Sequence, residues 1–352
     1  MKTHELELTV ALTALFLMAP PPLRAAPAVG TGGEVRAIPL PGASATGVGM
    51  DLIAYDRLRH RVWVPAGNTG SVDVVDTADS HVTRLEGFAT SEVERNGKRR
   101  TVGPSSATVG DDYVYVGNRG DLSVCAIDAK SLQKDSCIQL DSPPDALVYV
   151  RTTKEVWATM PRRDAIAIID VRKGAALAVK TEVRLDGAPE GFAVDDGRGV
   201  FYTNLEDKDR TLALDLKTRK VTANWQSSCG EGGPKGLAVD HSLDLVMVAC
   251  SDRVKVLDVG HGGKELSTID TGAGVDDIAY VEARHELYVG AAKAAKLTVA
   301  ILDAKGRLEV EAAIPTAPGV RNAVVTEEGV AYLTDSPEGK LLVVAPARAH
   351  AP

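Results

Sequence analysis

Apolar and polar residues alternate in short runs along most of the chain, and turn-forming residues separate the runs. The stretch VYVGNRGDLSVCAID, residues 114–128, alternates, breaks at Asn-Arg-Gly, alternates again and stops at an Asp. Alternation with a period of two predicts β-strands with one buried face, and a break containing Asn and Gly predicts a turn. This stretch therefore predicts two antiparallel strands.

The same strand ending recurs at nearly constant spacing. Six apolar strands stop at an Asp, namely Asp76, Asp128, Asp170, Asp215, Asp258 and Asp303. The spacings are 52, 42, 45, 43 and 45 residues, and a seventh copy has Ala345 in the Asp place. A period in the forties with several short strands per period is typical of β-propellers. The pattern predicts an all-β, seven-bladed β-propeller with four-stranded antiparallel blades.

Each repeat has four strands, a to d, in chain order. A Gly- or Pro-rich entry leads to strand a, and turns or loops connect strands b, c and d, as in GFAVD (191–195) for strand a and CIQL (137–140) for strand d. The last repeat lacks strand d, while GEVRAIPL (33–40) has no partner strands before it. We therefore predict that residues 33–40 form the outer strand of blade seven and close the ring.

Two segments carry a family resemblance. YVGN (115–118) and YTNL (202–205) are similar to the YVTN repeat, and the unit GAPEGFAVDDGRGVFYTN resembles repeats of YncE-like bacterial propellers. The resemblance covers residues 33–348, and it implies a seven-bladed, WD40-like ring and export from the cytoplasm. It implies no particular activity, because such rings serve as binding proteins and as enzymes.

The N-terminus has the features of an export signal. Lys2 precedes the apolar run LTVALTALFLM (8–18), and Pro-rich sequence with small residues follows, including Ala-Pro-Ala at 26–28. This pattern predicts a signal peptide over residues 1–28 and a mature protein, residues 29–352, that is periplasmic or secreted. The apolar run is too short to span a membrane. We expect a single propeller domain, no membrane span and a monomer.

Charge and cysteine content narrow the partners and the compartment. The net charge is −8 and no basic stripe is present, so we expect no nucleic-acid partner. An exported chain with four cysteines is expected to form disulfides. Cys125 and Cys137 fall on strands c and d of blade two, while Cys229 and Cys250 fall at the entry and on strand b of blade five. These places predict the pairs Cys125–Cys137 and Cys229–Cys250.

The repeated Asp residues are candidate metal ligands, but a structural role explains them better. Each stands at the start of the turn between strands c and d. An Asp side chain there accepts hydrogen bonds from backbone N–H groups about two residues on and stabilises the turn. We expect this role at all the Asp positions of the repeat.

A more variable position precedes strand a in every repeat. Strand a is innermost in a propeller, so the residues two positions before its first apolar residue are expected to ring one mouth of the central channel. They carry four carboxylates and two cations, a crowding that raises carboxylate pKa values or attracts a cation. The alternative is a self-paired charge ring that only caps the channel. The ring positions are Asp51, Ser105, Asp145, Glu190, Lys235, Asp276 and Arg321.

Loops on the same face add further candidates. The loops between strands b and c contribute Asn68, Asn118, Arg119, Asn204 and the charged run EDKDR (206–210). The alternative for the Asn residues is a role in turns, and for the charged run a solvated loop. The segment ATSEVERNGKRRTVG (89–103) is an insertion between blades one and two. We interpret it as a lid, a partner-docking loop or a tolerated surface insertion.

Motifs of common catalytic sites are absent from the sequence. It lacks the phosphate-binding GxxxxGKS/T motif, Cys/His zinc spacing, the haem-attachment motif CxxCH and the nucleophile motif GxSxG. Besides His4 and His350, which lie near the two ends of the sequence, five histidines are expected in turns on the face opposite the ring. Their place argues against haem or Ser-His chemistry at the ring. The five histidines are His60, His81, His241, His261 and His285.

We weigh two functions. The favoured one is an exported, non-catalytic propeller without a cofactor, which binds a small ligand, a peptide or a protein partner at the charged channel mouth. The alternative is a metal-dependent hydrolase similar in plan to lactonase propellers, in which one divalent cation on the axis, Ca²⁺ first among them, polarises a carbonyl and activates water. Lys235 and Arg321 argue against it, because cations near the axis repel a metal. Its ligands would be Glu190, Asn204, Asp276, Asp51 and Asp145.

Overall fold

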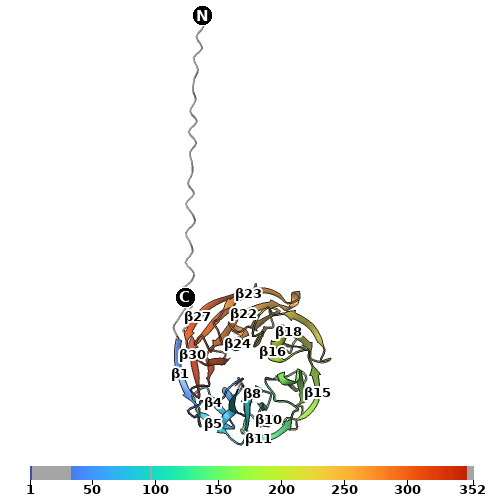
Figure 1. Cartoon of the computed structure of the whole chain (residues 1–352), viewed down its shortest axis with the longest axis vertical. Helices are drawn as coiled ribbons and strands as arrows, with labels where there is room; N and C mark the ends of the chain where they lie inside the picture. Colours follow the sequence, from blue (N-terminus) through green and yellow to red (C-terminus); the bar gives the residue numbers. More distant parts are fainter. Residues whose placement is uncertain (2–32, 96, 347–352) are drawn as a thin grey trace.

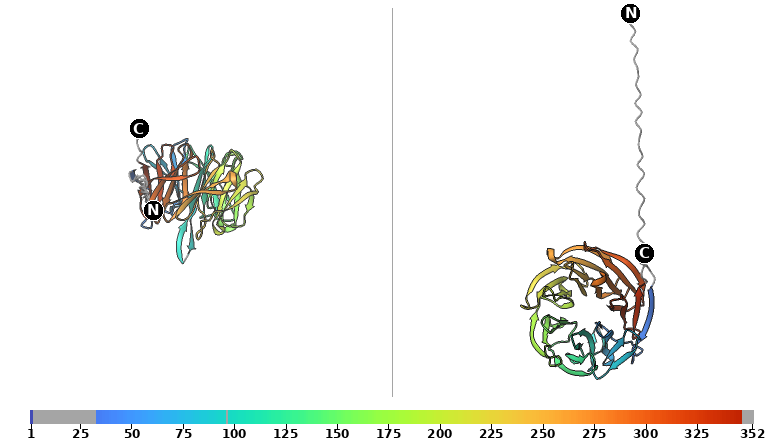
Figure 2. Two further views of the ribbon diagram at one scale, coloured as in Figure 1. Left: turned by 90° about the horizontal axis from the view of Figure 1, so that it is seen from above. Right: turned by 180° about the vertical axis from the view of Figure 1, so that it is seen from behind.

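The computed structural model describes Met1 and residues 33–95 and 97–346. Apart from Met1, the predicted signal peptide and its cleavage site lie outside the described residues. Seven four-stranded antiparallel sheets stand around a central channel and confirm the predicted propeller (Figure 1). A two-stranded hairpin of β6 (Ser91–Arg95) and β7 (Lys98–Val102) projects from one face of the ring (Figure 2).

The blades follow one another along the chain, and each begins at its innermost strand. Blade one contains β2 (Ala54–Asp56), β3 (Arg61–Ala66), β4 (Ser71–Asp76) and β5 (Val82–Leu85). Blade two contains β8 (Pro104–Val109), β9 (Tyr113–Asn118), β10 (Ser123–Asp128) and β11 (Lys134–Gln139). Blade three contains β12 (Leu147–Val150), β13 (Glu155–Met160), β14 (Ala165–Asp170) and β15 (Ala178–Arg184). Blade four contains β16 (Pro189–Asp195), β17 (Val200–Leu205), β18 (Arg210–Asp215) and β19 (Val221–Gln226). Blade five contains β20 (Leu237–Asp240), β21 (Leu245–Ala249), β22 (Arg253–Asp258) and β23 (Lys264–Asp270).

Blades six and seven complete the ring. Blade six contains β24 (Val275–Val281), β25 (Glu286–Ala291), β26 (Lys296–Leu302) and β27 (Leu308–Pro315). Blade seven contains β28 (Val320–Val325), β29 (Ala331–Asp335), β30 (Lys340–Pro346) and β1 (Gly33–Pro39). Short 3-10 turns follow the second strand of blades one, three and four, namely η1 (Gly67–Thr69), η2 (Pro161–Arg163) and η3 (Glu206–Lys208). Two more, η4 (Val259–His261) and η5 (Glu282–Arg284), lie on the opposite face.

The N-terminal strand closes the ring, as predicted. β1 pairs antiparallel with β30 as the outermost strand of blade seven, and Val35 lies opposite Val344. Ile38 and Leu40 are each only 4% exposed, and they pack with apolar residues of blades one and seven. Because segments from the two ends of the sequence share one sheet, the ring has no open junction.

Apolar side chains fill the spaces between neighbouring blades. One cluster joins Tyr202 and Ala213 of blade four to Val246 and Val248 of blade five. Val, Leu, Ile and Ala dominate such clusters, and their burial stabilises the ring. The apolar residues are therefore committed to the blade interfaces, and polar residues occupy the mouth of the channel.

The repeated Asp residues cap turns, as predicted. Asp128 Oδ1 accepts hydrogen bonds from the backbone N–H groups of Lys130 and Ser131 at 3.0 and 2.6 Å. These bonds lower the pKa of Asp128. Backbone N–H groups also donate to each of the other members, Asp76, Asp170, Asp215, Asp258 and Asp303.

Both predicted disulfides are present. Cys125 and Cys137 lie directly opposite each other on β10 and β11 and are bonded, and Cys229 is bonded to Cys250. The second bridge ties the entry of blade five to its second strand. Within the part of the chain that the structure describes, no helix is long and apolar enough to cross a membrane.

Candidate functional site

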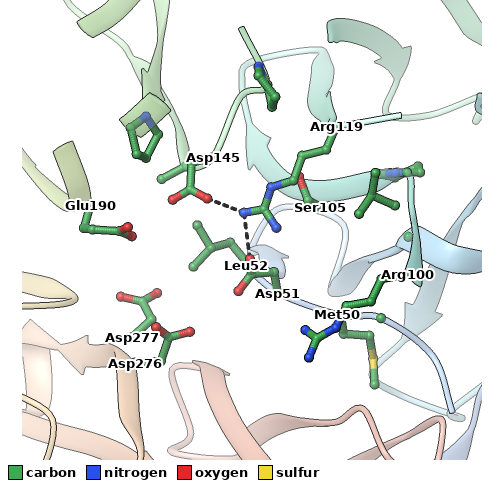
Figure 3. A pocket seen from close by; sticks show the side chains of 18 of the residues that line it. Met50, Asp51, Leu52, Arg100, Ser105, Arg119, Asp145, Glu190, Asp276 and Asp277 are labelled. Carbon is green, nitrogen blue, oxygen red and sulfur yellow. Dashed lines mark hydrogen bonds and ion pairs between the residues drawn. The ribbon is translucent and has the colours of Figure 1, made fainter. Parts of the chain in front are cut away.

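A cavity of about 680 Å³ lies at one mouth of the central channel. Its walls come from the entries to the innermost strands, the loops after the second strands and the β6–β7 hairpin. Figure 3 shows charged side chains from several blades around this space. All seven predicted ring positions line it: Asp51, Ser105, Asp145, Glu190, Lys235, Asp276 and Arg321.

β-Bulges explain how several of these side chains reach the channel. The innermost strands β8, β16, β24 and β28 each have an interruption of their pairing register near the start. A residue in a bulge has no partner in the hydrogen-bond ladder of the sheet. Its side chain therefore need not follow the alternation between the two faces of the strand. The residues left out are Ser105, Glu190, Gly191, Asp276, Asp277 and Asn322.

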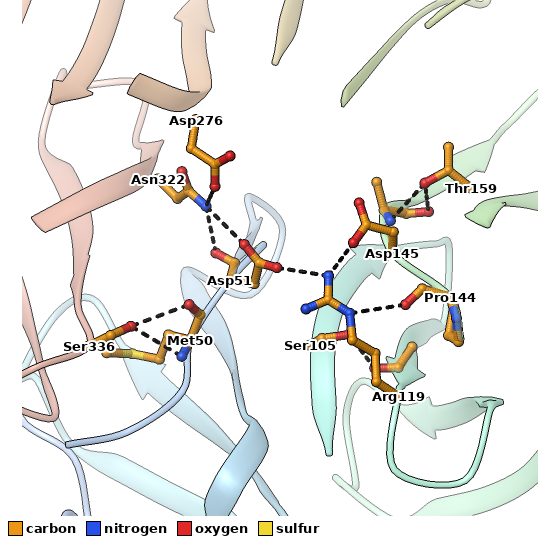
Figure 4. Close-up of polar contacts among 12 residues, drawn as sticks. Met50, Asp51, Ser105, Arg119, Pro144, Asp145, Thr159, Asp276, Asn322 and Ser336 are labelled. Atoms are coloured by element: carbon orange, nitrogen blue, oxygen red, sulfur yellow. Dashed lines mark hydrogen bonds and ion pairs between the residues drawn. The ribbon is translucent and has the colours of Figure 1, made fainter. Parts of the chain in front are cut away.

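Two arginines connect the ring carboxylates of three blades. Arg119 Nη2 lies 2.8 Å from Asp51 Oδ2 and also pairs with Asp145, so it bridges blades one and three (Figure 4). Arg321 Nη1 lies 2.7 Å from Asp276 Oδ2, and its Nη2 lies 3.4 Å from Asp51 Oδ1. Three carboxylates and two guanidinium groups therefore form one continuous chain of ion pairs along the mouth.

Asn322 strengthens the same chain from blade seven. Its Nδ2 donates to Asp276 Oδ2 at 3.0 Å and to Asp51 Oδ1 at 3.3 Å (Figure 4). Its Oδ1 accepts the backbone N–H of Asp277 at 3.0 Å. The residue has a φ of 41°, a backbone region that Asn adopts more readily than most residues. The oxygens of Asp51 are thus already engaged by protein donors.

Glu190, Glu206 and Lys235 form a second polar group on blades four and five. Lys235 Nζ pairs with Glu206 in η3. Glu190 shares a hydrogen bond with Glu206, and its carboxyl group has no ion pair with any described residue. Burial, the nearby charge of Asp145 and that hydrogen bond raise the pKa of Glu190 to about 9. The carboxyl group of Glu190 therefore releases its proton less readily than an ordinary glutamic acid.

Two more carboxyl groups of the cavity are difficult to ionise. Burial raises the pKa of Asp277 to about 7, and the charge of Asp276 acts in the same direction. Burial also raises the pKa of Asp145, although Arg119 opposes this effect. The pKa of Asp277 consequently lies close to neutrality, where an ordinary Asp is fully ionised.

The predicted loop residues divide into two groups. Arg119 and Asn68 line the cavity. Asn118 and Asn204 do not: they are 1% and 0% exposed, and their side-chain amides donate to the backbone carbonyls of Ala89 and Lys235 respectively. These two residues therefore fasten neighbouring segments together and stay out of the cavity.

Several lining residues were not predicted individually. Arg100 lies in the insertion 89–103, and Glu206 lies in the run 206–210, so the sequence had already placed both segments on the correct face. Arg162 follows a second strand, and Asp277 directly follows a ring position, two places that a repeat alignment could have indicated. The residues concerned are Arg100, Arg162, Glu206 and Asp277.

The residues of the cavity fit a metal ion poorly. The described parts of the chain contain no group of three or more His, Cys, Asp or Glu side chains placed to hold one. Among the predicted ligands, Asn204 is buried in backbone contacts, while Asp51, Asp145 and Asp276 are paired with arginines. Histidine is also missing from the cavity lining. The described histidines lie in turns on the opposite face, as predicted: His60, His81, His241, His261 and His285.

Comparisons with known proteins show a shared fold. No protein-family model matches the chain, and no curated protein matches it in sequence. A chain in a structure of the mitotic checkpoint complex has a TM-score of 0.74 at 15% identity, over 96% of this chain and 99% of that chain. Hydrazine synthase from Kuenenia stuttgartiensis has a TM-score of 0.70 at 14% identity, over 86% and 96%.

A third neighbour is virginiamycin B lyase from Staphylococcus aureus, in a catalytically inactive histidine-to-alanine variant with quinupristin. It has a TM-score of 0.68 at 13% identity, over 89% of this chain and 99% of that chain. A structure of RRP9 WD40 repeats has a TM-score of 0.69 at 8% identity, over 89% of this chain and 97% of that chain. At these identities the likeness shows the fold alone: this chain is similar to these proteins in being a β-propeller.

Proposed function

We propose that this protein is an exported binding protein whose axial cavity holds a small molecule. The observation that carries the proposal is the cavity itself, about 680 Å³ in volume and lined by residues from all seven blades. Small-molecule sites typically occupy about 300–1,000 Å³ and contain a few convergent polar groups. The size and the lining of this cavity meet both conditions.

The β6–β7 hairpin supports a small ligand in preference to a protein partner. Val93, Arg100 and Val102 line the cavity, so the hairpin forms part of its wall. A wall above the channel mouth reduces the open face available to a folded partner, and it increases the surface that can enclose a small ligand. Of the three interpretations of the insertion, the lid has the most support.

Catalysis has less support than binding. A divalent cation on the axis would have to displace the ion pairs that Arg119 and Arg321 make with the ring carboxylates. A histidine-to-alanine variant of virginiamycin B lyase is catalytically inactive, whereas no described histidine lines this cavity. A metal-dependent hydrolase and a lyase that depends on a histidine therefore have less support here than a binding protein.

The disulfides support export. Disulfides persist in oxidising compartments and are rare in the cytosol, and this chain forms two. They agree with the signal peptide predicted for residues 1–28. We therefore propose a periplasmic or secreted location for the mature protein.

A cavity-blocking variant provides the test. Gly49 lines the cavity, and a Cβ built there meets nothing nearer than Asn68 Oδ1 at 3.7 Å. Gly49→Trp therefore fills part of the cavity without displacing backbone. The matched control is Gly197→Trp, an exposed glycine in a turn on the opposite face, where a Cβ meets only Asp195 Oδ1 at 3.4 Å.

The assay is thermal unfolding of residues 29–352 with a panel of small charged molecules. The panel contains amino acids, tripeptides, dicarboxylates, sugar phosphates and polyamines. We expect at least one class to raise the melting temperature of the wild type and of Gly197→Trp but not of Gly49→Trp, because ligands that bind the native state stabilise it. A panel without any such class, or with equal shifts in both variants, would refute a small-molecule cavity.

A further inference from the structure

The ionisable side chains that line the cavity can be sorted by whether the protein already pairs them. Among the described residues, five basic and six acidic side chains line it. Arg119, Arg321 and Lys235 are paired with ring carboxylates or with Glu206. What remains without an ion pair to any described residue is two cations and two acids: Arg100, Arg162, Glu190 and Asp277.

Arg100 lines the cavity from strand β7 of the hairpin. Residues opposite each other in an antiparallel pair share one face of the ribbon. Arg100 lies opposite Val93, and both line the cavity, as does Val102 two residues further on. Arg99 lies opposite Glu94 on the other face of the ribbon; Thr101 of that face reaches the cavity, but Arg99 does not. Both arginines are exposed, and only Arg100 lines the cavity.

The two unpaired acids stand on the opposite wall. In a ring of seven blades, the junction between blades one and two, where the hairpin inserts, lies across the channel from blade five. Glu190 belongs to blade four and Asp277 to blade six, so they flank that position. Figure 3 shows the same separation, with Arg100 on one side of the cavity and Glu190 and Asp277 on the other.

We propose that the ligand is a small zwitterion, whose carboxylate binds Arg100 and whose ammonium group binds at Glu190 and Asp277. The inference rests on the proposed small-molecule cavity and specifies its ligand class. An anionic ligand alone would offer no cation to the acidic wall, and a cationic ligand alone would leave Arg100 and Arg162 without an ion pair. An ammonium group beside Glu190 and Asp277 would favour the ionised form of these buried acids. A molecule that carries both charges, separated along its length, satisfies both walls. A short peptide with free termini has this chemistry.

Calorimetric titration with four forms of tri-alanine tests the proposal. The forms are the free zwitterion, the N-acetyl anion, the C-terminal amide cation and the doubly capped neutral peptide. Charge-assisted hydrogen bonds contribute about 1.5–3 kcal/mol each, which corresponds to roughly tenfold to a hundredfold in affinity. We expect each cap to weaken binding at least tenfold.

Two variants assign the ends of the ligand. Arg100→Ala should weaken binding of the zwitterion at least tenfold and should abolish the effect of the C-terminal amide. Asp277→Asn should do the same for the N-acetyl cap, and Glu190→Gln provides a second variant of that wall if Asp277→Asn does not fold. Arg99→Ala, on the other face of the hairpin, is the matched control and should bind as the wild type does.

The outcomes separate this inference from the proposed function. If a capped peptide binds as tightly as the zwitterion, the zwitterion inference is wrong and the cavity remains a ligand site. The same holds if only dicarboxylates, sugar phosphates or polyamines bind the wild type and not Gly49→Trp. If Arg99→Ala and Arg100→Ala lose affinity equally, the assignment of Arg100 is wrong. If no panel molecule distinguishes Gly49→Trp from its control, both proposals fail.

Discussion

Glu190→Gln removes an ionisable group while keeping the shape of the side chain. The cavity raises the pKa of Glu190 to about 9 from an ordinary value of 4.5, mainly by burial. Gln retains an amide that can donate to Glu206 in place of the protonated acid. The substitution therefore isolates the energetic consequence of burying a carboxyl group that resists ionisation.

The sign of the effect follows from proton binding. Between pH 4.5 and 9 the folded protein holds a proton on Glu190 that the unfolded chain has released, so the free energy of unfolding of the wild type falls as pH rises through this window. One pH unit corresponds to about 1.4 kcal/mol. Because solvent in the cavity screens part of the effect, we expect burial of Glu190 to lower the free energy of unfolding of the wild type by about 1–2 kcal/mol at neutral pH.

Urea unfolding followed by tryptophan fluorescence measures this cost. We expect the free energy of unfolding of Glu190→Gln to be about 1–2 kcal/mol higher than that of the wild type at pH 7 to 8.5 and equal to it near pH 5. Glu94→Gln, an exposed position on the hairpin, controls for the loss of one negative charge and should show no such trend. A Glu190→Gln protein that is less stable at pH 8.5, or whose difference from the wild type is independent of pH, would refute the reasoning.

Three further predictions concern the ring and its charge network. Ile38→Ala in the closing strand should lower the free energy of unfolding by about 3 kcal/mol. Val35 on the same strand is 45% exposed, so Val35→Ala should change the free energy of unfolding by less than about 0.5 kcal/mol. Equal effects of the two substitutions in urea unfolding would contradict closure by β1. Asp128→Ala should cost about 1 kcal/mol through loss of its turn hydrogen bonds, and a neutral result in the same assay would exclude a capping role. Arg119→Met leaves the carboxylate of Asp145 without its cation, whereas Asp51 keeps Arg321. The substitution should lower the free energy of unfolding by about 3 kcal/mol at pH 8 and by less at acid pH, because burial raises the pKa of Asp145; a cost that grows toward acid pH would contradict the pairing.

The repeat made the fold predictable from the sequence. Strand endings at regular spacing predicted seven blades, and the unpartnered segment 33–40 predicted the closing strand. The same alignment placed all seven ring positions at one cavity, because a fixed offset from strand a becomes a fixed place around the axis. The periodicity of the sequence was sufficient to predict the location of a residue wherever its position in the repeat determines its place in the ring.

The contacts between side chains were not predictable in this way. Asn118 and Asn204 were predicted in loops but lie at the ends of the strands β9 and β17. Their amides bind carbonyls of Ala89 and Lys235, which are 29 and 31 residues away in the chain. Whether an amide at such a position faces ligand or backbone depends on which segment packs against it. The pairing of Arg119 with acids of two other blades likewise depends on the closed ring and not on any local pattern.

Ligand affinity in Gly49→Trp compared with Gly197→Trp tests the central claim most directly. The measurement is calorimetric titration of the panel molecule that most stabilises the wild type. We predict that Gly197→Trp keeps the dissociation constant of the wild type and that Gly49→Trp weakens binding by at least a hundredfold while its melting temperature without ligand stays near that of the wild type. Equal affinity in the two variants would mean that the ligand binds outside the axial cavity, and the account of the site would be wrong.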